Sequence, residues 1–130
     1  MATVLDIVSR SLRILRIIDP NQSVKATDLA TAIVALNGMM RRWEANGMAL
    51  GWSTVEAGTD PLPAPDEAHD AIAYNLAIRL RSEYGTALEP DVVALAQEGL
   101  SALRRDRAVE MPLEWERGGT YYDIRTDSYV

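Results

Sequence analysis

Cysteine and phenylalanine are absent from this chain of 130 residues, and histidine and lysine occur once each, as His69 and Lys25. Without cysteine there is no disulfide framework, no thiolate nucleophile and no cysteine-based zinc site, and a single histidine excludes a two-histidine metal motif. No apolar run approaches the roughly 18–20 residues of a membrane span, and the first residues lack a signal-peptide pattern. We therefore expect a soluble, unprocessed chain with no metal and no cofactor.

Basic residues are in the minority, with 13 Lys and Arg against 19 Asp and Glu and a net charge of −6. Because phosphate contacts require a basic stripe, this balance disfavours a free-standing nucleic-acid binder. The charge is unevenly distributed, with +3 over residues 1–42, −6 over 43–78, zero over 79–109 and −3 over 110–130. Opposite signs can meet between neighbouring copies, as in a ring, although an unevenly charged monomer has the same pattern.

Hydrophobic periodicity predicts four helices, over residues 4–18, from Ser23 or Thr27 to 46, over 66–84 and over 90–109. Thr3 and Asp6 form a capping-box variant before the first helix, and Asn46-Gly47 and Gly85 are typical left-handed caps. The fold class is therefore all-α, a small antiparallel bundle of about four helices. The apolar face of the first helix is wider than one neighbouring helix can cover.

Two segments do not follow the helical period. Residues 48–65 contain three prolines, Gly51 and Gly58, and they predict a long loop after the second helix. Residues 110–130 predict an extended C-terminal arm, separate from a helical body over 1–109. This arm holds four of the eight aromatic residues, which no predicted helix can absorb, and we expect them to bind a partner. They are Trp115, Tyr121, Tyr122 and Tyr129.

Three patterns that suggest catalysis are weak. Asp66-Glu67-Ala68-His69 spells a helicase box, but the chain has no phosphate-binding loop. His69 and Asp70 could join a serine in a triad, yet there is no Gly-x-Ser-x-Gly elbow. Glu56 with Asp60 or Asp66 could form a glycosidase pair if the carboxyl groups lay about 5–9.5 Å apart. The charged residues are more simply explained as a helix N-terminus and a solvated acidic loop, so we expect no enzyme.

Arg10, Arg13 and Arg16 follow one another at spacing three and form a basic edge on the first helix. Three interpretations stay open: a solvated helix face, a row of salt bridges to a partner, or a patch that faces DNA. Met39, Met40 and Trp43 on the second helix are more simply core residues than interface residues.

The sequence Leu36-x-x-Met39-Met40-x-x-Trp43-x-x-x-Gly47, followed by a Gly/Pro-rich loop and two further helices, resembles the head-to-tail adaptor family of tailed phages, especially the tail-accessory (packaged-DNA-stabilisation) proteins of short-tailed phages. The resemblance covers residues 5–109. It implies a structural virion protein that assembles as a ring of twelve copies under the portal protein at the head-tail junction. The ring would close the DNA channel after packaging and carry the next tail component, a nozzle or tail-tube protein.

The resemblance also implies roles for individual residues. The C-terminal arm would dock on the portal, and the helical body, with Arg10, Arg13 and Arg16, would make the subunit contacts. Residues 43–78 contain no Lys or Arg, and from this absence we expect the loop residues Trp52, Glu56 and Asp60 to face the channel or the tail, where acidic groups repel the passing DNA. The arm residues assigned to portal binding are Trp115, Tyr121, Tyr122, Ile124 and Tyr129.

Three other functions stay open. A connector, or head-completion, protein of a long-tailed phage shares a helical bundle at the same position. A virion-associated cell-wall hydrolase would use two loop carboxylates. An acidic helical regulator would fold its C-terminal segment on a small partner.

Overall fold

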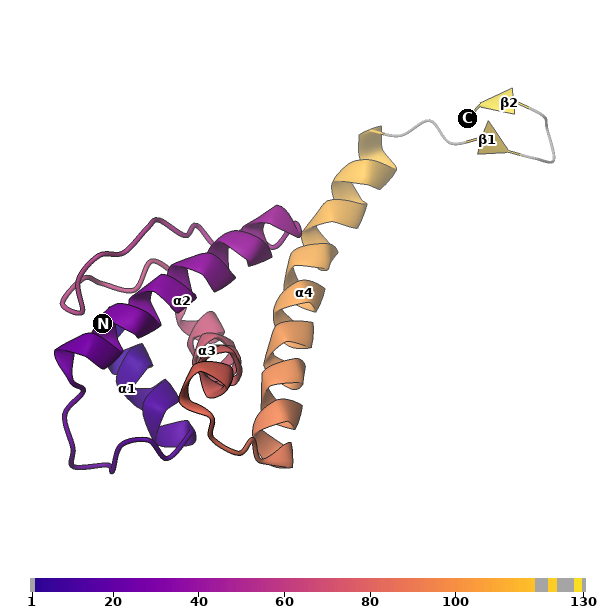
Figure 1. Cartoon of the computed structure of the whole chain (residues 1–130). Coiled ribbons are helices and arrows are strands. Elements are labelled where there is room, and N and C mark those ends of the chain that lie inside the picture. The colour runs from indigo at the N-terminus through magenta and orange to yellow at the C-terminus, as the bar shows by residue number, and fades with distance from the viewer. Residues whose placement is uncertain (1, 119–121, 124–127, 130) are drawn as a thin grey trace.

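The computed structural model describes the backbone of residues 2–118, 122–123 and 128–129, and the side chains of residues 2–106. Four α-helices form a small bundle (Figure 1), which confirms the predicted fold class. The elements are α1 (Val4–Ile14), α2 (Ala26–Ala45), the 3-10 turn η1 (Asp66–Ala68), α3 (His69–Tyr84), α4 (Pro90–Gly118), β1 (Tyr122–Asp123) and β2 (Ser128–Tyr129). The two short strands pair antiparallel, with Tyr122 opposite Tyr129.

The first helix has the predicted N-terminus but ends earlier than predicted. The Thr3 hydroxyl accepts the Asp6 N–H at 3.3 Å, and the Asp6 carboxylate accepts the Thr3 N–H at 2.9 Å. At the other end, Arg16 has a left-handed φ of 60° and the Ile17 N–H donates to the Leu12 carbonyl at 3.0 Å. This Schellman-type arrangement satisfies the last carbonyls of α1 four residues before Ile18.

At the ends of the other helices, some predictions are confirmed and one is wrong. Gly47 and Gly85 have φ values of 91° and 65°, as predicted for left-handed caps of α2 and α3, and Pro90 is the first residue of α4. The predicted end of the last helix at Val109 is wrong, because α4 continues to Gly118. Six of the nine residues 110–118 are good helix formers, such as glutamate, methionine and leucine, but Pro112 also lies in this stretch, and a proline inside a helix costs about 3 kcal/mol. The structure nevertheless has helix over residues 110–118, where an extended arm was predicted.

The core is centred on α3, which contacts α1, α2 and α4. Seven of its largest side chains are less than 2% exposed: Leu12, Leu36, Met39, Met40, Ile72, Leu76 and Leu80. Ser11 is the one buried polar side chain in the described part of the chain, and its hydroxyl lies 3.0 Å from the Ile7 carbonyl and 2.9 Å from the Ala73 carbonyl. The hydroxyl therefore links α1 to α3.

A small residue on each helix allows α3 and α4 to approach closely. A Cβ atom at Gly99 would lie 2.9 Å from the Ala71 Cβ and 3.0 Å from the Ala71 Cα. Beside this contact, the Asn75 side chain donates to the Ala96 carbonyl at 3.1 Å. Because nothing larger than hydrogen fits at residue 99, the packing of these two helices depends on that glycine.

A hydrogen bond joins the ends of α2 and α3. The Tyr84 hydroxyl donates to the Asp28 carboxylate at 2.8 Å. Burial of the phenol, this hydrogen bond and the nearby negative charges raise the pKa of Tyr84 to about 12. In the described residues, no helix combines the length and the apolar character needed to cross a membrane.

Candidate functional site

The segment between α2 and η1, residues 48–65, is held against the bundle, and we call it the strap. Asn37 on α2 makes three hydrogen bonds to it. The Asn37 side chain accepts from the Trp52 indole N–H at 3.2 Å and from the Val55 N–H at 3.1 Å, and it donates to the Val55 carbonyl at 2.8 Å. One turn after Asn37, Arg41 donates to the Thr54 hydroxyl, and about one turn further, the Glu44 carboxylate accepts the Trp52 N–H.

The other end of the strap caps the first helix. The Val4 N–H donates to the Asp60 carbonyl at 3.0 Å and the Leu5 N–H to the Gly58 carbonyl at 2.9 Å. These N–H groups belong to the first turn of α1 and have no partner inside the helix. Because Met48, Leu50, Val55 and Leu62 are also buried in the core, the strap is part of the body. It lies against the first turn of α1, the helix whose apolar face was predicted to be wider than one neighbouring helix can cover.

Asn37, Arg41 and Glu44 were not among the predicted site residues, although the sequence contains a signal. The three residues follow one another at spacings of four and three, beside the apolar series Ile33, Leu36, Met40 and Trp43. Their place beside the apolar stripe puts these side chains at the border of the buried face, within reach of a segment that packs there.

The Asp60 carboxylate holds the end of the strap in shape. The Asp60 side chain accepts the N–H groups of Glu56 and Ala57, both at 3.0 Å, and these two hydrogen bonds lower the pKa of Asp60 below its ordinary value. A carboxyl group that is easily ionised is the opposite of the general acid that a glycosidase requires. Glu56 is exposed and Trp52 is half-buried against α2.

His69 lies at the start of α3 and does not form a triad. Its Nε2 atom is 3.8 Å from an Asp66 carboxylate oxygen and has no hydrogen-bond partner in the described part of the chain. Over the same part, no three histidine or acidic residues gather where they could hold a metal ion. The helicase-like letters are the η1 turn that leads into α3.

The predicted basic edge is not carried by one helix, because α1 ends at Ile14 and Arg16 lies beyond it. Two of the three arginines pair within the chain. Arg10 pairs with Asp70 of α3 and lies 5.7 Å from the centre of the Tyr74 ring. Arg16 pairs with Glu89 before α4, at 3.0 Å. Arg13 is exposed, and it pairs with no acidic side chain that the structure describes. Each pair is partly exposed and is worth about 0–1 kcal/mol.

The residues of the Leu-x-x-Met-Met motif lie in the core. Leu36, Met39 and Met40 are fully buried and Trp43 is 6% exposed, while Gly47 takes the left-handed cap after α2. Of the proposed arm residues, Trp115 lies within α4, Tyr122 in β1 and Tyr129 in β2, and their side chains are outside the described part. Tyr121 and Ile124 lie outside the described residues altogether.

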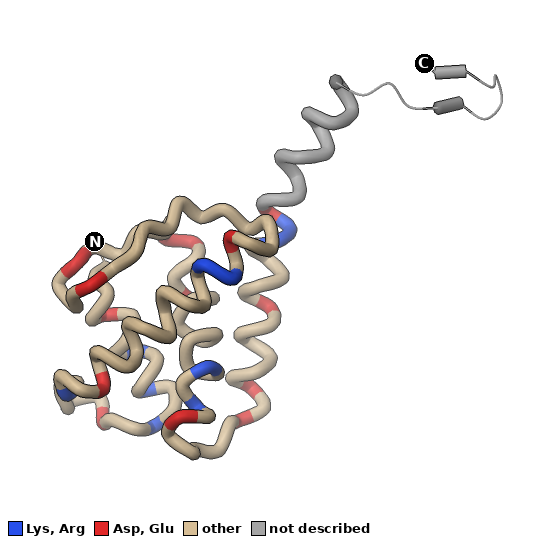
Figure 2. Tube along the Cα trace, turned by 45° about the horizontal axis from the view of Figure 1, so that its top comes forward, with Lys and Arg blue, Asp and Glu red and all other residues tan. Residues whose placement is uncertain are grey.

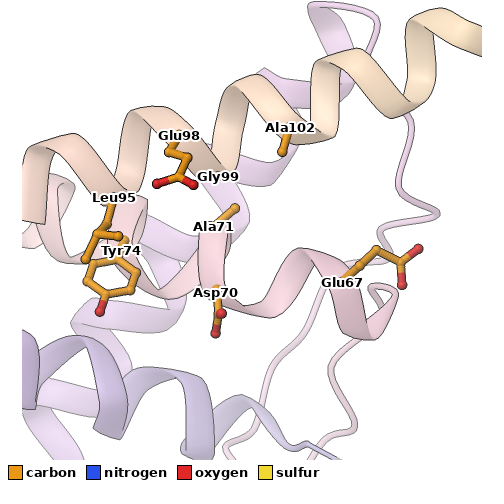
Figure 3. A pocket seen from close by; sticks show the side chains of 8 residues that line it. All are labelled: Glu67, Asp70, Ala71, Tyr74, Leu95, Glu98, Gly99 and Ala102. Atoms are coloured by element: carbon orange, nitrogen blue, oxygen red, sulfur yellow. The ribbon is translucent and has the colours of Figure 1, made fainter.

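Two grooves that were not predicted lie beside the contact of α3 and α4. The first, which we call the acidic groove, is a cavity of about 260 Å³. In Figure 3, Ala71 and Gly99 form its floor where the helices meet, and the carboxylates of Glu67, Asp70 and Glu98 lie around it. Leu95, which is 43% exposed, lines the end of the groove next to Tyr74.

The second groove, the arginine groove, has a cavity of about 410 Å³. Buried Met39 and Trp43 and half-buried Ile78 and Leu100 supply apolar lining. Exposed arginines come from three different helices: Arg42 from α2, Arg79 from α3 and Arg104 from α4. Figure 2 shows basic residues at the C-terminal end of α2 and acidic residues along the strap. No short sequence pattern connects the three arginines, because only the fold brings them together.

The chain matches the sequence profile of a known protein family. The sequence profile of a family described as P22 tail accessory factor matches residues 1–124 of the chain. No curated protein sequence matches it. The profile covers the helical body, the strap and most of the C-terminal segment.

Proposed function

The chain belongs to the P22 tail accessory factor family, and from this membership we propose that it is a head-to-tail adaptor of a tailed phage. Its role in the virion is structural. It assembles as a ring of twelve copies under the portal protein, closes the DNA channel after packaging and carries the nozzle or tail-tube protein. The match over residues 1–124 is the observation that carries this proposal.

The described fold supports a structural role. Its most distinctive polar groups, Asn37, Asp60 and Ser11, are engaged with backbone groups and hold elements of the fold together. A hydrolase would need a carboxyl group with a raised pKa, whereas the pKa of Asp60 is lowered. The proposed adaptor therefore acts by binding, through surfaces that a stable helical body presents.

Portal binding is assigned to the C-terminal segment. Residues 110–130 carry a net charge of −3 and four aromatic residues, the residue type that anchors many interfaces. One segment would bind modestly because it loses conformational entropy when it orders, and a closed ring of copies would bind firmly through multivalency. Packaged DNA would pass through the channel beside acidic loop residues such as Glu56 and Asp60, without sequence-specific binding.

The test compares the full chain with a chain truncated after Gly118, which retains all of α4. We expect truncation to reduce binding to the cognate portal ring at least tenfold while the urea unfolding curve of the body keeps its midpoint. A second variant, Trp115→Ala, tests the aromatic residue inside α4. Unchanged portal affinity in both variants would refute the assignment of this segment, and no portal binding by the full chain would refute the adaptor function.

A further inference from the structure

We propose that neighbouring copies of this chain pair by placing α4 of one copy, with Leu95 and Glu98, in the arginine groove of the next. This inference rests on the proposed ring function and names the surfaces through which the ring would form. The three arginines of the groove would face Glu67 and Glu98 of the acidic groove of the adjacent copy.

The arginine groove has the features of a docking surface that lacks a partner. Arg42, Arg79 and Arg104 are exposed, and none pairs with an acidic side chain among residues 2–106. Three like charges around one apolar cavity repel one another unless anions lie between them. Because Arg42 and Arg79 lie on packed helices, the groove is held in place by the core rather than by a loop.

The acidic groove presents the complementary surface. Leu95 is one of three large apolar side chains that are exposed in the described part of the chain, and Glu98 follows it one turn later on α4. Glu67 and Glu98 are exposed and unpaired within residues 2–106. Asp70 already pairs with Arg10 over the Tyr74 ring, which shows that this surface accepts a guanidinium group between a carboxylate and an aromatic ring.

The two grooves can be used at the same time by one copy. They share no residue. On α4, the acidic groove is lined by Leu95, Glu98 and Ala102, and the arginine groove by Leu100 and Arg104. The two sets lie on different sides of the helix. A contact between two different surfaces is heterologous, and heterologous contacts build rings when the rotation closes. A contact between the acidic grooves of two copies, or between their arginine grooves, would instead bring like charges together.

A charge exchange in the full-length chain tests this pairing. The acid-side variant is E67R/E98R and the arginine-side variant is R79E/R104E. We expect each variant alone to lose self-association at least tenfold relative to the native chain, because its two surfaces then carry the same sign. An equimolar mixture restores opposite signs at every contact and should recover self-association. Sedimentation velocity over a concentration series, alone and with the cognate portal ring, measures the effect.

The matched controls reverse the same number of charges outside the grooves. They are E83R/D106R and R81E/R105E, on exposed positions of α3 and α4. Each control has the same net charge as its test variant, so it separates the groove contact from general electrostatic attraction. We expect both controls to self-associate like the native chain. A third groove variant, Leu95→Ser, removes the apolar contact without adding a charge and should also weaken self-association.

The result separates this pairing from the proposed function. Native self-association in both groove variants, or a mixture that stays dissociated, overturns the pairing even if the chain binds the portal. Groove-dependent self-association of a chain that does not bind the portal supports the pairing and refutes the adaptor function. If the control variants lose as much self-association as the groove variants, the pairing is also overturned, because the effect would then follow net charge alone.

Discussion

Asn37 is a residue on which the position of the strap depends. Replacing it with alanine removes three hydrogen bonds and leaves the N–H and the carbonyl of Val55, a residue that is 4% exposed, without a partner. Buried groups left in this way cost about 1–3 kcal/mol, so we expect Asn37→Ala to lower the free energy of unfolding by about 2 kcal/mol. Urea denaturation measures this. Asn21→Ala, at an exposed position, is the control, and equal stability of the two variants would contradict the role of Asn37.

Tyr84 should make stability depend on alkaline pH. Its folded-state pKa of about 12 lies above the ordinary 10, because burial and the hydrogen bond to Asp28 favour the neutral phenol. The stabilisation is therefore fully present below pH 10 and is lost as the pH rises through about 12. We expect the stability difference between the native chain and Tyr84→Phe to shrink over this range. Absorbance at the tyrosinate band should show one late-titrating tyrosine that is missing in Tyr84→Phe.

Among the elements, the contact of α3 with α4 depends on Gly99. In Gly99→Ala, the new methyl group meets Ala71 at 2.9 Å, so the helices must move apart. Overpacking of this kind costs about 1–3 kcal/mol, although alanine recovers up to about 1 kcal/mol of helix propensity. Gly38→Ala is the matched control, because no atom lies within 4 Å of a Cβ at that position of α2. We expect the midpoint temperature of thermal unfolding to fall in Gly99→Ala and to rise in Gly38→Ala. The same change in both variants would contradict the packing argument.

The N-terminus of α1 is stabilised by its capping box and should respond to acid. Hydrogen bonds from the backbone and the side chain of Thr3 lower the pKa of Asp6 below 3.8. A lowered pKa gives stabilisation that is present above the ordinary pKa and is lost as the pH falls through the folded-state value. We expect Asp6→Ala, which removes the carboxylate that accepts the Thr3 N–H, to cost about 0.5–1 kcal/mol at neutral pH. Urea denaturation near neutral pH and below pH 3.8 should show this difference shrinking in acid, and a constant difference would contradict it.

At the scale of the whole molecule, the strap couples α2 to α1. Asn37 holds its middle, and Gly58 and Asp60 accept the N–H groups of Leu5 and Val4 at its far end. We expect Asn37→Ala to accelerate amide exchange at Val4 and Leu5 more than at Leu76 in the centre of α3. Hydrogen exchange by NMR measures this, and equal acceleration at all three amides would indicate global rather than local opening.

The sequence by itself determined the helical class, the four helices, the capping box at Thr3, the left-handed caps at Gly47 and Gly85 and the burial of Leu36, Met39, Met40 and Trp43. These features depend on periodicity and on interactions between residues a few positions apart, which a sequence displays directly. The motif around Met39 also indicated the family. By contrast, the pairing of Arg10 with Asp70, the attachment of the strap to Asn37 and the two charged grooves join residues that are far apart in the chain. Only the tertiary structure decided them, because α3 brings the other three helices to its surface and thereby sets which distant side chains become neighbours.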